Sequence, residues 1–139
     1  MAILMDRAAL EDHLRGDFGP LGDALQIETV TPEAVTLRLT PRATEIRHGG
    51  TVSGPALFLL ADVAFYMAVL AKAGPKKMSV TVSASIDYLR RPAGDLPVLG
   101  EARVHKLGRS LAMGQVLMRN PDSDDVLAQA QLTFALPPS

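Results

Sequence analysis

The stretch from Gly54 to Ala73, GPALFLLADVAFYMAVLAKA, constrains this chain more than any other segment. It is apolar on every side at helical spacing, and Asp62 is the charge near its middle. Helices that are hydrophobic all round are normally buried. Twenty residues at a rise of 1.5 Å span about 30 Å, the width of a small domain. We therefore predict one long buried helix over about 53–73, with a carboxylate fixed inside it.

Both ends of this helix carry the expected residues. Ser53 or Gly54 fits the N-cap, Pro55 fits the first helical turn, and Gly74-Pro75 fits the end. A membrane span is the alternative, because residues 54–71 are 18 residues with a single charge. A central aspartate costs about 2.5–3.5 kcal/mol on bilayer insertion. The strand-like segments that follow also need a helix to pack on, so we favour a core helix.

Length and composition restrict the remaining possibilities. A chain of 139 residues predicts one domain over 1–139. The absence of cysteine excludes disulfides and thiol chemistry, and it is compatible with the cytoplasm. A net charge of −1 gives no reason to expect binding to nucleic acid or to a membrane surface. Asp6 interrupts the first apolar run, so we expect no signal peptide and a cytoplasmic protein.

The segments around the long helix alternate in patterns typical of short elements. Residues 6–14 predict a helix that residues 16–22 break, and residues 41–52 predict an irregular approach to the long helix. Lys76-Lys77 predicts a polar turn. Alternating apolar residues predict strands at 24–30, 35–40, 79–89, 98–106, 111–119 and 126–134. The expected fold class is α+β, with an antiparallel sheet wrapped around the long helix.

This order of elements and the run Leu60-Ala61-Asp62 resemble the hotdog fold, and more narrowly the PaaI-type acyl-CoA thioesterases, over about 18–134. These enzymes commonly carry an Asn-x-x-Gly-x-x-His-Gly-Gly run, with a catalytic Asp eight residues after the glycine that starts the helix. The literal match His48-Gly49-Gly50 puts Asp62 thirteen residues after Gly49. Aligning Ser53-Gly54-Pro55 instead restores a spacing of eight, and we favour that alignment.

In the favoured alignment, Arg47, Ser53 and Pro55 stand where the family has Asn, His and the second Gly. Thioester hydrolysis needs a donor for the developing oxyanion and a base or nucleophile for the acyl carbon. The Gly54 N–H at a helix start fits the donor, whereas Pro55 has no N–H to donate. Asp62 fits the base or nucleophile. The structural alternatives are a plain helix cap and a hydrogen-bonded carboxylate that only positions a neighbour.

Spacing adds the prediction of a dimer. Eight residues along a helix span about 12 Å, so Gly54 and Asp62 of one helix cannot both touch one carbonyl group. A two-fold partner whose helix runs antiparallel brings Asp62 of one chain to Gly54 of the other. We therefore expect a homodimer, and leave open whether dimers pair into a homotetramer.

The remaining candidates depend more on the resemblance. Related enzymes carry a Ser or Thr near the attacking water, which implies a catalytic role for Thr81, otherwise an ordinary strand residue. In similar thioesterases, basic residues near the turns between strands contact the phosphates of CoA, and the resemblance implies the same role here. The structural alternative is that these residues only face solvent. The substrate-binding candidates are Arg47, His48, Ser53, Phe58, Arg90, Lys106 and Arg109.

The functional hypothesis is a thioesterase acting on an acyl-CoA. It needs no cofactor, since CoA is part of the substrate, and the scattered histidines give no metal site. Two alternatives stay open. One is a hotdog hydratase or dehydratase that pairs His48 with Asp62. The other is a non-catalytic dimer that binds an acyl-CoA or another small ligand, with Arg47 and Pro55 marking lost catalysis.

Overall fold

The computed structural model describes residues 2–75 and 78–138. The predicted turn at 76–77 therefore lies outside the described residues. In chain order the elements are α1 (Arg7–Phe18), η1 (Gly19–Gly22), β1 (Leu25–Val30), β2 (Val35–Leu39), η2 (Ala43–Glu45), β3 (Ile46–Arg47), β4 (Thr51–Val52), α2 (Gly54–Ala73), β5 (Val80–Tyr88), β6 (Val98–Leu107), β7 (Leu111–Arg119) and β8 (Val126–Ala135).

The long helix α2 begins and ends where its capping residues predict. The Ser53 hydroxyl accepts a hydrogen bond from the Ala56 N–H at 3.2 Å, and the Gly74 N–H donates to the Leu70 carbonyl at 2.9 Å. Gly74 has a φ of 94°, which glycine adopts without strain. By length and composition α2 could cross a membrane, but 67% of its most apolar window is buried inside the fold. It is the core helix of this domain.

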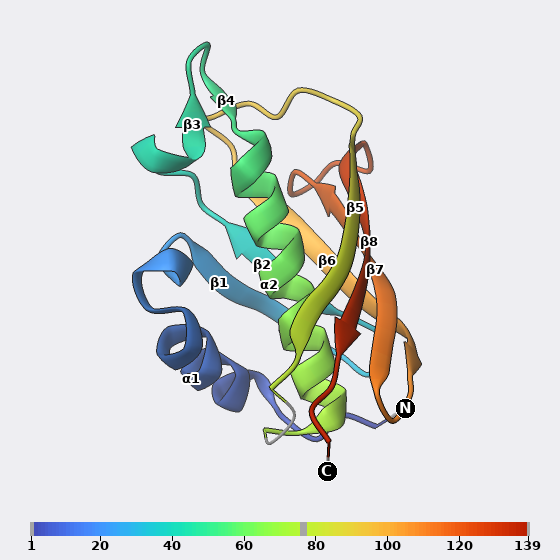
Figure 1. Ribbon diagram of the computed structural model, residues 1–139. Coiled ribbons are helices and arrows are strands. Elements are labelled where there is room, and N and C mark those ends of the chain that lie inside the picture. Colours follow the sequence, from blue (N-terminus) through green and yellow to red (C-terminus); the bar gives the residue numbers. More distant parts are fainter. Residues whose placement is uncertain (1, 76–77, 139) are drawn as a thin grey trace.

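A six-stranded antiparallel sheet, in the order β1-β2-β6-β7-β8-β5, curves around α2 and confirms the predicted fold class (Figure 1). Along most of β6, β7 and β8, alternate side chains point at the helix, as half-covered antiparallel strands require. The largest fully buried side chains include Phe65 and Leu60 from α2 and Phe134 from β8. The rings of Phe65 and Phe134 pack edge to face, with centroids 4.9 Å apart.

Three sequence predictions need correction. The first helix does not break at Gly16 but continues to Phe18, and it ends at Gly19, whose φ is 54°. The segment 41–52 is not irregular throughout, because it forms the short hairpin β3–β4. The hairpin turns at Gly49 and Gly50, which both have positive φ. In β5, finally, the strict alternation expected over residues 80–88 is interrupted by a bulge between Thr81 and Ser83.

The bulge decides which way Thr81 points. Thr81 pairs with the inward-facing Phe134, whereas Ser83, two residues later, pairs with the outward side of β8 at Thr133. An extra residue in one strand reverses the side-chain alternation beyond it. Thr81 therefore faces α2 together with Ala84, Ile86 and Tyr88, although an unbroken strand would place it on the opposite face.

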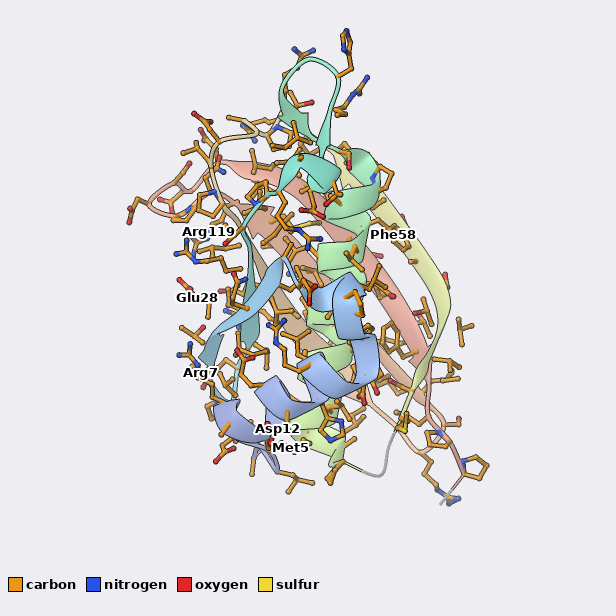
Figure 2. The ribbon with its side chains drawn as sticks, turned by 90° about the vertical axis from the view of Figure 1, so that its left-hand side faces the viewer. Met5, Arg7, Asp12, Glu28, Phe58 and Arg119 are labelled. Atoms are coloured by element: carbon orange, nitrogen blue, oxygen red, sulfur yellow. The ribbon has the colours of Figure 1, made fainter. Side chains whose placement is uncertain are left out.

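The two edge strands of the sheet differ, because α1 covers the edge at β1 and leaves the edge at β5 open. At the β1 edge, α1 side chains take up the backbone groups, since Arg7 donates to the Ile27 and Glu28 carbonyls and Glu11 accepts from the Ile27 N–H. Figure 2 shows Arg7 and Glu28 near one another at this edge. On the other edge, β5 pairs with β8 on one side only, and Val80 and Val82 are more than half exposed. Open strand edges are sites of pairing with another chain.

A buried carboxylate anchors the segment that leads into α2. Glu45 accepts hydrogen bonds from the Arg42 N–H and guanidinium and from the Thr44 hydroxyl, and its own carbonyl accepts from the Ser53 N–H at 2.8 Å. Chiefly through the Arg42 side-chain hydrogen bond, these contacts lower the pKa of Glu45 from 4.5 to about 2.

We expect Glu45→Gln to destabilise the protein at neutral pH and to make little difference in strong acid. A carboxyl whose folded pKa is lowered stabilises the fold fully above its unfolded value of 4.5, and this contribution is lost as the pH falls toward about 2. Urea unfolding of wild type and variant at several pH values between neutral and strongly acidic checks this. A stability difference that is zero at neutral pH, or that grows in acid, would contradict it.

Candidate active site

A cleft of about 710 Å³ opens at the amino end of α2. Its wall comes from the β3–β4 hairpin, the first turn of α2 and the chain that leaves β5. It brings together four residues predicted for the site: Arg47, His48, Gly54 and Arg90. Arg91 lines it as well, and none of the described lining residues is acidic. The cleft is therefore suited to an anionic group.

The first turn of α2 leaves one backbone donor free toward this cleft. The Ala56 N–H bonds the Ser53 hydroxyl and the Leu57 N–H bonds the Ser53 carbonyl, while Pro55 has no N–H. Among residues 2–75 and 78–138, none accepts a hydrogen bond from the Gly54 N–H. An unpaired N–H at a helix start attracts negative charge, in agreement with the predicted role of Gly54.

Tyr88, the last residue of β5, lies over Gly54 and was not predicted as a site residue. Its hydroxyl donates to the Gly54 carbonyl at 3.1 Å, and it lines the cleft. A Cβ atom at position 54 would meet the Tyr88 ring and hydroxyl at 3.4 Å, so the ring sits close against the glycine. The sequence pattern that could have identified Tyr88 is the alternation of β5, which puts this residue on the face that covers α2.

Asp62 and Thr81 form the second part of the candidate site. The Thr81 hydroxyl donates to one carboxylate oxygen of Asp62 at 2.7 Å, so these two predicted catalytic residues do lie together. The expectation of an enclosed carboxylate is wrong for the protomer, since Asp62 is half-exposed and Thr81 exposed. The sheet leaves this face of α2 partly uncovered, and among residues 2–75 and 78–138 none donates a hydrogen bond to the second carboxylate oxygen.

Phe58 lies one turn before Asp62 on the same side of α2. It is 38% exposed and projects from the helix above the end of α1 (Figure 2). Phe58 and Asp62 therefore share a helix face that a second surface can cover. Within one protomer, Asp62 and the Gly54 N–H are separated along α2 by the rise of eight residues, about 12 Å.

The other predicted binding residues lie elsewhere. Ser53 caps α2 with its hydroxyl and does not line the cleft. Lys106 lies on the outer face of the sheet, in a separate hollow of about 400 Å³ with Ser83 and Ser85. Arg109 is exposed in the turn between β6 and β7. The protomer thus does not bring Lys106 or Arg109 to the cleft at Gly54.

Comparisons with known proteins agree with this architecture. The family model of the thioesterase superfamily matches residues 49–127, which include the β3–β4 hairpin tip, all of α2 and β5. No curated protein matches the chain.

Solved structures extend the likeness to nearly the whole chain. A candidate thioesterase from Silicibacter sp. TM1040 is 36% identical, with a TM-score of 0.92 over 99% of this chain and 96% of that one. A mutant of the phenylacetic acid degradation protein PaaI from Thermus thermophilus is 26% identical, with a TM-score of 0.70 over 81% and 92%. Zebrafish thioesterase superfamily member 2, 22% identical over 96% and 99%, shares the fold with a TM-score of 0.85. The chain belongs to the thioesterase superfamily, as a PaaI-type thioester hydrolase with the hotdog fold.

Proposed function

We propose that the protein hydrolyses acyl-CoA thioesters to a free acid and CoA, at a site shared by two protomers. The observation that carries this proposal is the 2.7 Å hydrogen bond that holds the Asp62 carboxylate through Thr81 on an open face of α2. A carboxylate held at one oxygen keeps its other oxygen for a reacting atom. The free Gly54 N–H supplies the donor that the developing oxyanion needs.

Two routes use the same groups. As a general base, Asp62 takes a proton from water while the water oxygen attacks the acyl carbon, and the carbonyl electrons move onto the oxygen held by the Gly54 N–H. The intermediate then collapses, the carbon–sulfur bond breaks, and the sulfur receives the proton. As a nucleophile, Asp62 itself attacks, and water hydrolyses the resulting anhydride. Both routes release a carboxylic acid and the CoA thiol.

The open edge of β5 supports the shared site. A two-fold antiparallel pairing of β5 with its copy sets the beginning of each strand, which carries Thr81, against the end of the other strand, which carries Tyr88. Thr81 and Asp62 of the partner then arrive beside Tyr88 and Gly54, so each cleft is completed by the other chain's carboxylate.

We expect an obligate dimer as a consequence. The exposed apolar side chains of β5 and the half-exposed face of α2 need a covering surface, and both edges of β1 are already occupied by β2 and α1. Sedimentation equilibrium at micromolar concentration should show dimers, or pairs of dimers, and no folded monomer. A folded monomer at micromolar concentration would refute both the dimer and the shared site.

The cleft at Gly54 is the best candidate for the phosphates of CoA. Arg47, Arg90 and Arg91 line it, and Arg90 is held there by a 2.7 Å hydrogen bond from its guanidinium to the Val126 carbonyl. Guanidinium groups suit phosphate oxygens because their donors form a planar fork.

We expect Arg47→Ala to raise KM for an acyl-CoA about tenfold with little change in kcat, since the phosphates bind equally in ground and transition states. The increase should shrink in 0.5 M salt, roughly where exposed charges are screened over a few ångströms. Acyl-pantetheine, which lacks the nucleotide, serves as a control, because its KM should not respond. Arg109→Ala tests the competing prediction at the β6–β7 turn. If Arg109→Ala raises KM and Arg47→Ala does not, the phosphates bind at that turn instead.

A panel of short, medium, long and aryl acyl-CoAs, with release of free thiol as the readout, tests the function itself. Turnover of at least one thioester supports the proposal. Loss of the enoyl absorbance on hydration of an enoyl-CoA, without thiol release, would identify a hydratase. Binding of acyl-CoA without either reaction would identify a ligand-binding dimer.

A further inference from the structure

We infer that the Tyr88 hydroxyl is the second oxyanion donor of this site. The inference rests on the proposed function and adds a catalytic residue to it. A developing oxyanion is best stabilised by two preorganised donors, and removal of one such donor costs about 10²–10³ in kcat. The first turn of α2 provides one free donor toward the cleft, the Gly54 N–H. The second donor must therefore come from a side chain.

Tyr88 is placed to supply that donor. Its hydroxyl is 3.1 Å from the Gly54 carbonyl oxygen, in the same residue as the free N–H, and both residues line the cleft. One side of the ring lies against Gly54 while the rest of Tyr88 is exposed, and the hydrogen bond to the Gly54 carbonyl holds the hydroxyl at the helix start. When the thioester carbonyl arrives, the hydroxyl can rotate from the neutral Gly54 carbonyl to the oxyanion, which is a stronger acceptor because it is charged.

The location of Tyr88 in β5 relates this donor to the shared site. Positions 84, 86 and 88 face α2, and β5 runs antiparallel to the helix, so its last residue reaches the first residue of α2. In the two-fold arrangement proposed above, the partner's Thr81 and Asp62 come to this end of β5. Each β5 strand thus carries two hydroxyl groups with different roles. Tyr88 is an oxyanion donor for the cleft of its own chain, and Thr81 orients the carboxylate that serves the cleft of the partner.

The test is Tyr88→Phe, which keeps the ring against Gly54 and removes only the hydroxyl. With the best acyl-CoA of the panel, kcat should fall about 10²-fold while KM changes little. A CoA analogue with a trifluoromethyl ketone in place of the thioester, whose hydrate is tetrahedral, should bind at least tenfold more weakly to the variant. An S-alkyl-CoA thioether, which has no carbonyl, should bind wild type and variant equally.

Tyr66→Phe is the matched control, because Tyr66 is the other of the two tyrosines and also makes one 3.1 Å hydrogen bond, to Asp17. Its kcat should stay within about twofold of wild type. Equal loss of affinity for ketone and thioether would mean that Tyr88 only positions the helix start, which overturns the inference. An unchanged kcat in Tyr88→Phe, with an active wild type, overturns it as well. A wild type inactive on every thioester would overturn the proposed function and this inference together.

Discussion

Replacing Asp62 by Asn is expected to lower kcat for acyl-CoA hydrolysis by about 10²–10⁴, the usual contribution of a positioned acid–base group. Asparagine has nearly the same size and can still accept the Thr81 hydrogen bond at 2.7 Å, so the fold and the dimer should persist. It can neither take a proton nor attack as a carboxylate. KM should change little, because the group acts mainly in the transition state. Steady-state kinetics of the purified variant provide the measurement.

Asp17→Asn is the control for this variant. Asp17 also accepts a hydrogen bond from a hydroxyl, that of Tyr66 at 3.1 Å, but it lies on α1 outside the candidate site. Its kcat should remain near that of wild type. A folded, dimeric Asp62→Asn protein that turns over at the wild-type rate would disprove the mechanism.

If the site is shared between two chains, two inactive variants should complement one another in a mixed dimer. Gly54→Leu should be inactive because its side chain fills the cleft next to the free N–H. Mixed with Asp62→Asn and allowed to exchange subunits, it should regain activity. In such a heterodimer, Asp62 of one chain faces Gly54 of the other at one intact site. Random 1:1 exchange should restore about one quarter of the wild-type rate, since half of the dimers then carry one of two sites. No recovery after verified exchange would mean that each site belongs to a single chain.

The second large effect is expected at Gly114 on β7. A Cβ atom there would lie 2.0 Å from the Arg103 carbonyl oxygen and 2.5 Å from a ring carbon of Phe65. Neither neighbour can yield easily, because one is backbone in the paired strand β6 and the other is a fully buried ring in the core. Gly114→Ala should therefore reduce the free energy of unfolding by about 3 kcal/mol, at the upper end of ordinary overpacking costs.

Chemical denaturation of Gly114→Ala and of Gly16→Ala measures this prediction against a matched control. Gly16 lies inside α1, and a Cβ atom there would meet nothing within 4 Å. Because alanine favours helix, Gly16→Ala should stabilise the protein by about 0.5–1 kcal/mol. The same chemical change should thus have opposite signs at the two positions. A Gly114→Ala protein as stable as wild type would show that β6 and β7 can separate at this point without cost.

Some of the candidate site could be predicted from sequence, with the help of the resemblance. The spacing of Gly54 and Asp62 depends on one helix, whose geometry is regular, and it predicts that the two groups cannot act within one chain. Thr81 was identified through the resemblance, not through its pattern. Val80, Thr81 and Val82 alternate as apolar, polar and apolar residues, which is the pattern of an unbroken strand. A bulge in β5 does not change this pattern, so the sequence did not predict it.

The sequence alone determined α2, from Gly54 to Ala73, since its caps, its proline and its continuous apolar surface are local properties of one segment. It also determined the bounds of β7, where apolar alternation is regular. Only the tertiary structure decided that Thr81 faces Asp62, that Tyr88 lies over Gly54 and that the carboxylate is half-exposed. These features depend on strand register, on a bulge and on the curvature of the sheet. All three arise from pairing between segments far apart in the chain, which no local pattern of residues specifies.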